Sequence, residues 1–164
     1  MHHAAAPASP PTITVRVAAA VHAADACGVI RQSITHCCVL DHANDATILT
    51  TWLANKTPEN LAAWMAAPGA VAWGAYWGDT MVGFALRART TLALCYVVPG
   101  ALHQGVGRAL LQHVEAHARE VGLATLDLES TRTAEPFYRR HGYVPHGGVQ
   151  TWAGLQAQPM RKVL

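Results

Sequence analysis

The sequence predicts a mixed α/β domain built on one central sheet. Segments with the two-residue alternation of strands interchange along the chain with segments of helical periodicity, and no repeat period is visible. Hydrophobic residues make up 51% of the 164 residues and charged residues only 13%, which is typical of a globular chain with a full core. We expect residues 1–11, which are small and rich in proline, to be a tail outside a single domain at residues 12–164.

The first part of the chain predicts one strand followed by helices. Apolar side chains alternate over Thr12–Val17, which predicts a strand, and Ala20–Cys38 has helical periodicity that could break at Gly28. Asp45 and Thr57 are the predicted N-caps of two further short helices, because their side chains can accept hydrogen bonds from the first turn.

Most of the predicted sheet comes from the middle of the chain. Ala70–Trp77 and Met81–Ala88 predict a hairpin, and the almost wholly apolar Leu92–Val98 predicts a buried strand. A long helix then ends at Gly122, and Ala124–Glu129 predicts the next strand. Three closing strands around a turn at 147–148 are predicted at Tyr143–Val144, Thr151–Trp152 and Gln158–Leu164.

Two glycines, Gly105 and Gly107, stand where the long helix begins. The first amides of a helix have no internal partner, the helix dipole adds positive charge there, and glycines let an anion approach. The pattern therefore suits a phosphate or pyrophosphate, although the same glycines could serve packing or a turn. It is neither a P-loop nor a dinucleotide fingerprint, because no Gly-Lys-Ser/Thr and no G-x-G-x-x-G is present.

A second motif, A-E-P-F-Y-R-R-H-G-Y, follows at Ala134–Tyr143. The strand ending in Tyr96-Val97-Val98-Pro99, the Gly105-x-Gly107 helix and this motif, in this order and spacing, resemble the GNAT superfamily of acetyl-CoA-dependent N-acetyltransferases. The resemblance covers roughly the last two-thirds of the chain. It implies a mostly antiparallel twisted sheet of about six to seven strands flanked by helices, with acetyl-CoA as acyl donor and no metal. It also implies direct transfer of the acetyl group to an amine through a ternary complex.

The resemblance implies a role for each matching residue. Backbone amides from Gln104 to Ala109 would hold the coenzyme A pyrophosphate, and Val97 and Val98 would pair with the pantetheine arm. Tyr138 would lie beside the thioester sulfur and assist the leaving thiolate. The predicted coenzyme-binding residues are Val97, Val98, Leu102, His103, Gln104, Gly105, Val106, Gly107, Arg108, Ala109, Thr133 and Phe137.

Two of these residues depart from the pattern of the family. Leu102 stands where a Gln or Arg is usual, so we expect a change in coenzyme affinity rather than a loss of binding. Thr133 stands where many members have Asn, and its hydroxyl is expected to cap the helix that follows.

The general base is left open by the sequence. The strand Leu92–Val98 carries no acid where several family members place a Glu, so Glu129 at the end of the next strand is the candidate, directly or through a water molecule. His103 and His36 are alternatives. The missing acid also keeps a second function open, that of a non-catalytic acyl-CoA-binding regulatory or sensor module. A nucleotide-binding protein that uses the glycine loop is a third and weaker interpretation.

The acceptor is predicted to be a small-molecule or peptide amine. Five aromatic residues lie close together in the first half of the sequence, and they either pack in the core or form an aromatic wall for a cationic or apolar acceptor. They are Trp52, Trp64, Trp73, Tyr76 and Trp77.

Composition limits the other partners. A net charge of +2 with no basic run argues against nucleic acid, and no apolar stretch is long enough to span a membrane. The segment His36-Cys37-Cys38 lacks the spacing of a zinc site, so we expect no metal. The first residues do not have the pattern of a signal peptide, and reduced cysteines in the cytoplasm are expected. A homodimer is compatible with the sequence.

Overall fold

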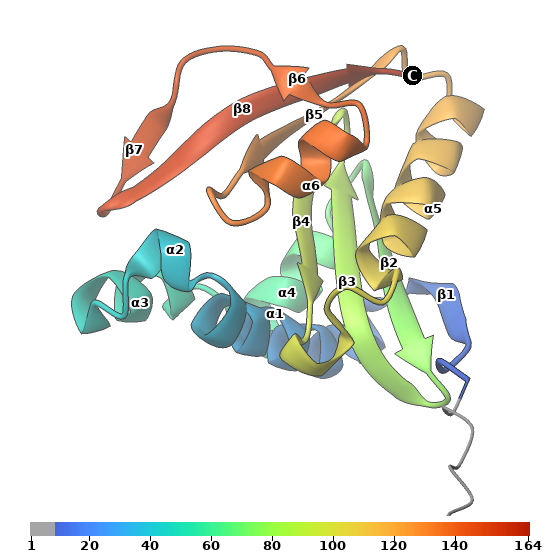
Figure 1. The fold of residues 1–164 in the computed structure, drawn as a ribbon. Coiled ribbons are helices and arrows are strands. Elements are labelled where there is room, and N and C mark those ends of the chain that lie inside the picture. Colours follow the sequence, from blue (N-terminus) through green and yellow to red (C-terminus); the bar gives the residue numbers. More distant parts are fainter. Residues whose placement is uncertain (1–8) are drawn as a thin grey trace, which may run out of the picture.

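A computed structural model describes residues 9–164 (Figure 1), so residues 1–8 of the predicted tail lie outside the described residues. The elements in chain order are β1 (Ile13–Ala18), η1 (Ala20–His22), α1 (Ala23–Cys37), α2 (Val39–His42), α3 (Ala46–Leu53), α4 (Pro58–Met65), β2 (Ala70–Trp77), β3 (Thr80–Ala88), β4 (Thr91–Val97), η2 (Pro99–Ala101), α5 (Val106–Glu120), β5 (Thr125–Ser130), α6 (Glu135–Arg140), β6 (Val144–Pro145), β7 (Gln150–Trp152) and β8 (Leu155–Val163).

One sheet organises the fold, in the order β1-β2-β3-β4-β5-β8-β6, with β7 also paired to β8. All neighbouring strands are antiparallel except β4 and β5, which are parallel. The predicted fold class, a mostly antiparallel sheet flanked by helices, is therefore confirmed. The sheet has eight strands, because the two-residue β6 and the three-residue β7 form separate pairs with the long β8.

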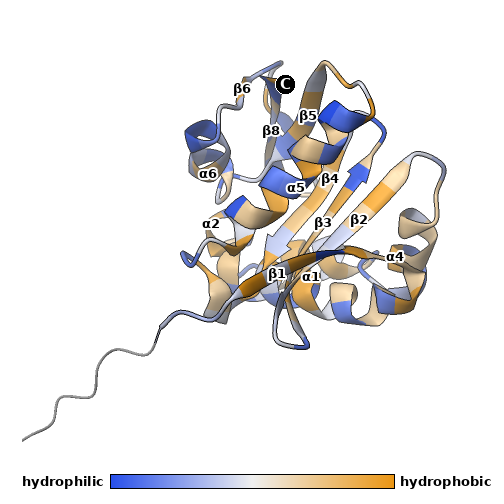
Figure 2. Ribbon diagram, turned by 90° about the vertical axis from the view of Figure 1, so that its right-hand side faces the viewer, coloured by the Kyte–Doolittle hydropathy of each residue, from blue (hydrophilic) through white to orange (hydrophobic). Residues whose placement is uncertain are grey.

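Helices cover both faces of the sheet (Figure 1). α1, α3 and α4 pack on one face around Ile30, Leu61 and Phe84, and α5 and α6 pack on the other around Leu110 and Leu126. The central strand β3 is buried at every position between its ends, and Figure 2 shows the central strands as largely apolar. In the part of the chain that the structure describes, none of the helices has the length and apolarity needed to cross a membrane.

The predicted caps are confirmed at two helices and wrong at one. Asp45 accepts hydrogen bonds from the amides of Thr47 and Ile48 at 2.9 and 3.0 Å, and Thr57 caps α4. The cap predicted at Thr133 is wrong, since the N-cap of α6 is Ala134 and has no side-chain hydrogen bond. Helix α1 also runs unbroken through Gly28.

The strand predicted to be buried, β4, is only partly so. Leu92 is buried, but Ala93 is exposed and the rest of β4 is half-buried, because that half of the strand lines an open cleft. The predicted turn at 147–148 also differs, since the hairpin that joins β7 to β8 turns at Ala153-Gly154, where both residues have positive φ.

A close approach of α5 to the sheet depends on Gly83 of β3. A Cβ atom at this position would lie 2.8 Å from Cγ1 of Val106 and 2.9 Å from Cδ1 of Leu110. Real Cβ contacts of this length do not occur, so with any larger residue the side chains of Val106 and Leu110, or the start of α5 that carries them, would have to move. Gly83 therefore allows the start of α5 to lie close to β3.

Candidate active site

The two parallel strands separate soon after they meet. β4 and β5 pair only at Thr91–Asp127 and Leu92–Leu128, whereas β5 stays paired with β8 along its whole length. The backbone edge of β4 beyond Leu92 therefore faces an open cleft instead of a neighbouring strand.

The orientation of the β4 amides follows from one hydrogen bond. The N–H of Val98 donates to the carbonyl of Val82 on β3 at 2.9 Å. Because successive amides of a strand point to opposite sides, the N–H and C=O of Val97 point toward the cleft, where Sγ of Cys37 lies 3.9 Å from the Val97 oxygen. Of the two residues predicted to offer an amide, Val97 is placed to do so and Val98 is not.

The cleft between the separated strands has a volume of about 730 Å³. Its walls come from β4, the first turn of α5, α6 and the end of α1. Among the predicted site residues, those that line it are Val97, Leu102, His103, Gly105, Val106, Gly107, Arg108, Glu129, Thr133, Phe137 and Tyr138. Three predicted residues do not line it, namely Val98, Gln104 and Ala109.

The start of α5 explains which amides are free. Gly105 is the N-cap with φ of 85°, a conformation that favours glycine. The first helical hydrogen bond runs from the amide of Ala109 to the carbonyl of Gly105 at 3.0 Å. The amides of Val106, Gly107 and Arg108 thus have no partner within the helix, whereas that of Ala109 is already used, contrary to prediction.

Two further predicted residues have structural partners. The side-chain amide of Gln104 donates to the carbonyl of Gly100 at 3.0 Å, within its own loop. Thr133 donates both its N–H, at 3.2 Å, and its hydroxyl to the carboxylate of Asp41, which also accepts the N–H of Arg132 at 2.7 Å. Asp41 therefore ties α2 to the loop between β5 and α6, and this contact accounts for the Thr133 side chain.

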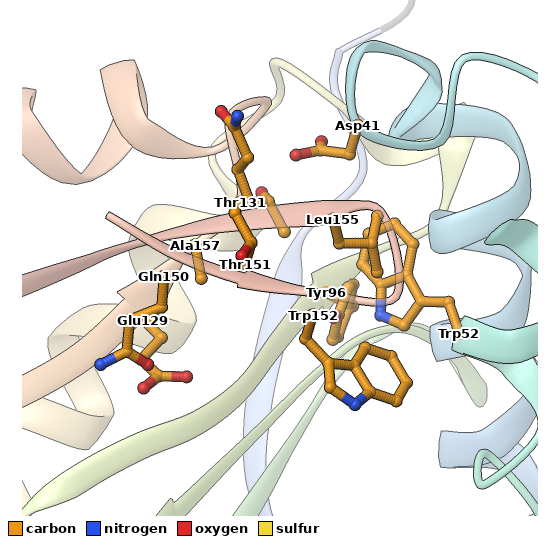
Figure 3. Close-up of a pocket in the computed structure, with 11 residues that line it drawn as sticks. Asp41, Trp52, Tyr96, Glu129, Thr131, Gln150, Thr151, Trp152, Leu155 and Ala157 are labelled. Carbon is orange, nitrogen blue, oxygen red and sulfur yellow. The ribbon is translucent and has the colours of Figure 1, made fainter. Parts of the chain in front are cut away.

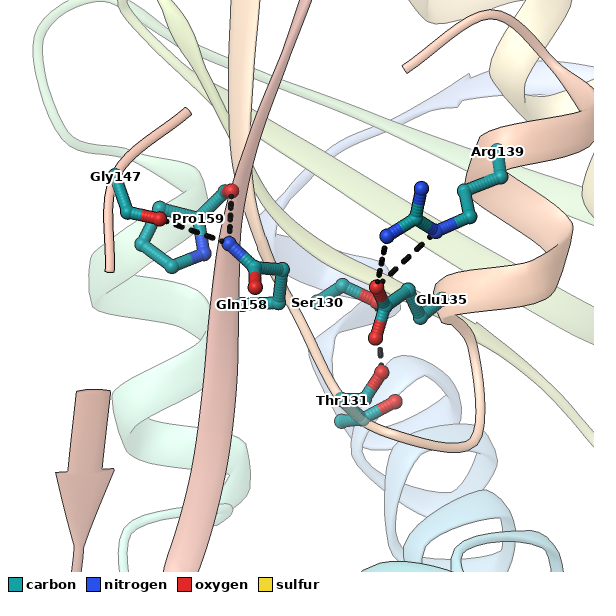
Figure 4. Close-up of polar contacts among 7 residues, drawn as sticks. All are labelled: Ser130, Thr131, Glu135, Arg139, Gly147, Gln158 and Pro159. Carbon is teal, nitrogen blue, oxygen red and sulfur yellow. Dashed lines mark hydrogen bonds and ion pairs between the residues drawn. The ribbon is translucent and has the colours of Figure 1, made fainter. Parts of the chain in front are cut away.

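Positive charge lines the larger cleft. Arg108 and Arg140 both lie in its wall, whereas the neighbouring Arg139 is held by Glu135 at 2.8 Å (Figure 4). Sequence reasoning missed Arg140, although a basic pair directly after the F-Y motif was a signal that could have found it. Two guanidinium groups near three free helix amides suit an anionic ligand.

Tyr138 is buried against β4. Its ring packs edge-on against Phe137, with centroids 5.2 Å apart. Burial raises the pKa of Tyr138 well above its ordinary value of 10.0, and a hydrogen bond to the thiol of Cys95 adds to this rise. Burial also raises the pKa of Cys95 to about 12, and the same hydrogen bond opposes that rise. The Tyr138 hydroxyl therefore lies at Cys95 of β4, two residues before Val97.

A smaller pocket of about 290 Å³ adjoins the cleft (Figure 3). Tyr96, Glu129 and Thr131 line both cavities, so the two meet at these residues. The other residues that line the smaller pocket are Asp41, Trp52, Gln150, Thr151, Trp152, Leu155, Gln156 and Ala157.

The loop and strand at this junction are fixed by backbone contacts. The carbonyl of Thr131 accepts the amide of Glu135 at 3.1 Å. On β8, the side-chain amide of Gln158 donates to the carbonyls of Gly147 and Pro159 at 3.0 and 2.9 Å (Figure 4). The first contact fixes the β5–α6 loop, which follows Glu129 in the chain. The contacts of Gln158 join the segment between β6 and β7 to β8.

The predicted aromatic wall is only partly present. Trp52 lines the smaller pocket, but Trp73 and Tyr76 are core residues on opposite faces of the sheet. Trp64 and Trp77 are half-buried and line neither cavity. The other aromatic residues of the pocket are Tyr96 and Trp152, and Trp152 is 59% exposed. Sequence reasoning missed Trp152, because it lies outside the cluster in the first half of the chain.

The alternative bases lie in different places. His103 lines the larger cleft, whereas His36 lines neither cavity. Glu129 is exposed and lies where the cavities meet. His42, next to the cysteine pair, is a core residue whose ring bonds the carbonyl of Ile34 and the amide of Asn44 at 3.0 Å each. Within residues 9–164, no three His, Cys, Asp or Glu side chains come together as a metal site.

Three features occur together in this fold: a parallel strand pair that separates, a helix that begins with a glycine at the separation, and a buried tyrosine beside it. They are the features on which the resemblance to the GNAT acyltransferases rests. The model of the acetyltransferase (GNAT) domain matches residues 32–164. The chain therefore belongs to the GNAT family, and the prediction of an acyltransferase enzyme is confirmed.

Solved structures of low sequence identity share this fold. A GCN5-related N-acetyltransferase from Rhodopseudomonas palustris superposes with a TM-score of 0.81 at 23% identity, over 95% of this chain and 97% of that one. The PaiA N-acetyltransferase of Thermoplasma acidophilum, solved in complex with coenzyme A, gives a TM-score of 0.77 at 18% identity, over 93% and 99% of the two chains. At these identities the likeness shows the fold alone.

Among curated proteins, the amino-acid acetyltransferase of Pseudomonas putida is 43% identical over 56 residues. That of Azotobacter vinelandii is 45% identical over 56 residues. These 56 residues are 34% of this chain and only 13% of those relatives.

The tyrosines provide a prediction about pH. Burial raises the pKa of all four tyrosines, Tyr76, Tyr96, Tyr138 and Tyr143. Each folded-state pKa lies above that of the unfolded chain, so their contribution to stability is complete below about pH 10 and is lost as pH rises beyond it. We expect ultraviolet titration to show tyrosinate appearing only together with alkaline unfolding, as followed by circular dichroism. Tyrosine ionisation that precedes unfolding would contradict this placement.

Proposed function

We propose that residues 12–164 form a domain that transfers the acetyl group of acetyl-CoA directly to an amine, within a ternary complex of donor, acceptor and enzyme. The observation that carries the proposal is the meeting of two cavities of opposite character at Glu129. The larger cleft has arginines and free helix amides, and the smaller pocket has carboxylates. An acyl donor in the first would present its reactive end to an acceptor in the second.

The coenzyme would be held by charge at one end and by backbone at the other. The unpaired amides at the start of α5, together with Arg108 and Arg140, suit the pyrophosphate. The open edge of β4 offers the C=O of Val97 to an amide N–H of the pantetheine arm. Leu102, in the cleft wall but 37% exposed, adds apolar contact without a charge.

Acyl transfer needs a neutral amine, a polarised carbonyl and a stabilised thiolate. Glu129 is placed at the junction to take the proton of the amine, directly or through water. The N–H of Val97 is the donor for the developing oxyanion.

Tyr138 would assist the leaving thiolate as a hydrogen-bond donor. With ordinary pKa values, full proton transfer from a tyrosine to a thiolate costs about 2 kcal/mol. Burial raises the pKa of Tyr138 and so increases that cost. A hydrogen bond from the hydroxyl, with the proton finally supplied from the amine, is therefore the favoured course.

The alternative of a non-catalytic acyl-CoA-binding module is disfavoured by the smaller pocket. A sensor has no need for an acceptor cavity that opens beside the thioester end of the donor site, with an acid at the junction. All four cysteines are unpaired thiols, which fits the cytoplasmic location that we propose.

Gly107 provides a test of coenzyme binding. A Cβ atom there would lie 3.3 Å from Cζ of Phe137 and 3.8 Å from Cγ2 of Val97, so the side chain of Gly107→Val would enter the cleft. We expect coenzyme A to bind at least about tenfold more weakly by calorimetry, since contacts of charged groups with amides are lost. Gly100→Ala is the matched control, because its Cβ meets nothing within 4 Å. Unchanged affinity in a folded Gly107→Val protein would remove the proposed pyrophosphate site.

Tyr138→Phe tests the chemistry. The substitution keeps the packing against Phe137 and removes only the hydroxyl, so coenzyme affinity should hardly change. Turnover with an accepted amine should fall by roughly ten- to a thousandfold, as for other groups that assist proton transfer. Thiol release, followed continuously, is the measurement, and turnover equal to that of the unmodified protein would assign Tyr138 to packing alone.

A further inference from the structure

The smaller pocket is acidic, and no basic side chain balances it. Asp41 and Glu129 both line it, whereas none of its eleven lining residues is Lys, Arg or His. Asp41 accepts the hydrogen bonds described above from a neutral backbone and a hydroxyl, so its negative charge is not neutralised by an ion pair. The ion pairs within residues 9–164 do not include Glu129 either. The pocket therefore favours a cation.

The end of the pocket away from Glu129 is aromatic (Figure 3). Figure 3 shows the indoles of Trp52 and Trp152 at one end and Glu129 with Gln150 at the other. Trp52 comes from α3 and is 7% exposed, whereas Trp152 comes from β7 and is 59% exposed. Two indoles from different elements form a surface for an apolar or aromatic body, and they also attract a cation.

The aromatic end is fixed by a tight contact. The turn between β7 and β8 rests on α3, since a Cβ atom at Gly154 would lie 2.8 Å from Cδ1 of Ile48. Because Gly154 also has φ of +84°, only glycine fits this turn without strain. The distance between the elements that carry Trp52 and Trp152 is therefore held by packing.

The size of the pocket limits the ligand. A volume of about 290 Å³ is at the lower end of the range for small-molecule sites. A compact molecule fits, with its amine at Glu129 and its body between the indoles.

We infer that the acceptor is a small primary amine with an apolar or aromatic body and no carboxylate, of the arylalkylamine type. The inference rests on the proposed function and adds the substrate class to it. A free α-amino acid with its amine at Glu129 carries a carboxylate that would also lie close to Glu129, in a pocket whose lining has a second carboxylate, Asp41, and no cation to receive it, and like charges brought together in this way oppose binding. The pocket therefore rejects amino acids in spite of the short likeness to amino-acid acetyltransferases.

The bonds and protons of the acetyl transfer balance between acetyl-CoA and the amine alone. The nitrogen of the neutral amine forms a bond to the acetyl carbonyl carbon, and the bond from that carbon to sulfur breaks. The amine loses one proton, and the thiolate gains one to become coenzyme A thiol. Neither oxidant nor further reactant is needed.

The test compares amines that differ only in the carboxylate. Phenethylamine is compared with phenylalanine, and tryptamine with tryptophan, each with acetyl-CoA and the full chain. We expect kcat/KM from thiol release to be at least about thirtyfold higher for the amine of each pair. Equal or better turnover of the amino acids would overturn the inference.

Two pairs of variants separate charge from shape. Trp152→Ala should raise KM for phenethylamine by roughly five- to thirtyfold with little change in kcat, and Trp152→Phe should restore it. Gln150→Arg places a cation in the pocket. The ratio of kcat/KM for the amine to kcat/KM for the matching amino acid, which we call the preference, should then fall by at least about tenfold. Val149→Arg, which adds the same charge to an exposed residue outside the pocket, should leave the preference unchanged.

Failure of the substrate class and failure of the proposed function give different results. Acetylation of amino acids alone overturns the inference and leaves the acetyltransferase intact. No thiol release with any of the four compounds also overturns the inference, and calorimetry with acetyl-CoA then decides whether the function fails with it, because loss of the function predicts no binding in the larger cleft. A preference narrowed equally by Gln150→Arg and Val149→Arg would show that the charge of the pocket does not select the acceptor.

Discussion

The separation of β4 from β5 after two residue pairs is the constraint on which the rest of the structure depends. A strand whose edge lost its partner would normally leave amides and carbonyls without hydrogen bonds. Here the strand is kept in place by β3, which still pairs with it as far as Val97, and the open edge becomes the wall of a cleft. β5 in turn is kept in place by β8. The sheet can open because each of the two strands is secured by a different neighbour.

The elements around the opening are positioned by close contacts. Gly83 lets α5 lie close to β3, and the free amides of the first turn of α5 then lie at the cleft. Asp41 ties the β5–α6 loop to α2. Gly154 seats the β7–β8 hairpin on α3. Each contact positions an element that carries residues lining one of the two cavities. In this way a rigid frame presents groups of opposite charge to two cavities that meet at Glu129.

The sequence predicted the elements and most of the named residues that line the larger cleft, because these depend on local signals. Asp45 and Thr57 marked two helix starts. Gly105 marked the start of α5, because glycine adopts the positive φ of this N-cap without support from residues elsewhere in the fold. Thr133 was predicted wrongly as a cap, because its partner Asp41 lies 92 residues away in the sequence. Val98 and Ala109 were predicted to offer free amides that pairing and helix formation in fact use. Trp152 was missed because only the tertiary fold brings β7 beside α3.

The central claim, that donor and acceptor meet at Glu129, is tested most directly by a crystal structure with a non-hydrolysable acetyl-CoA analogue and phenethylamine. We expect the pyrophosphate at the amides of Val106, Gly107 and Arg108, and the carbonyl oxygen within hydrogen-bond distance of the Val97 N–H. The amine should lie between Glu129 and the carbonyl carbon. Coenzyme density outside the cleft of β4 and β5, or an amine bound away from the smaller pocket, would contradict the claim.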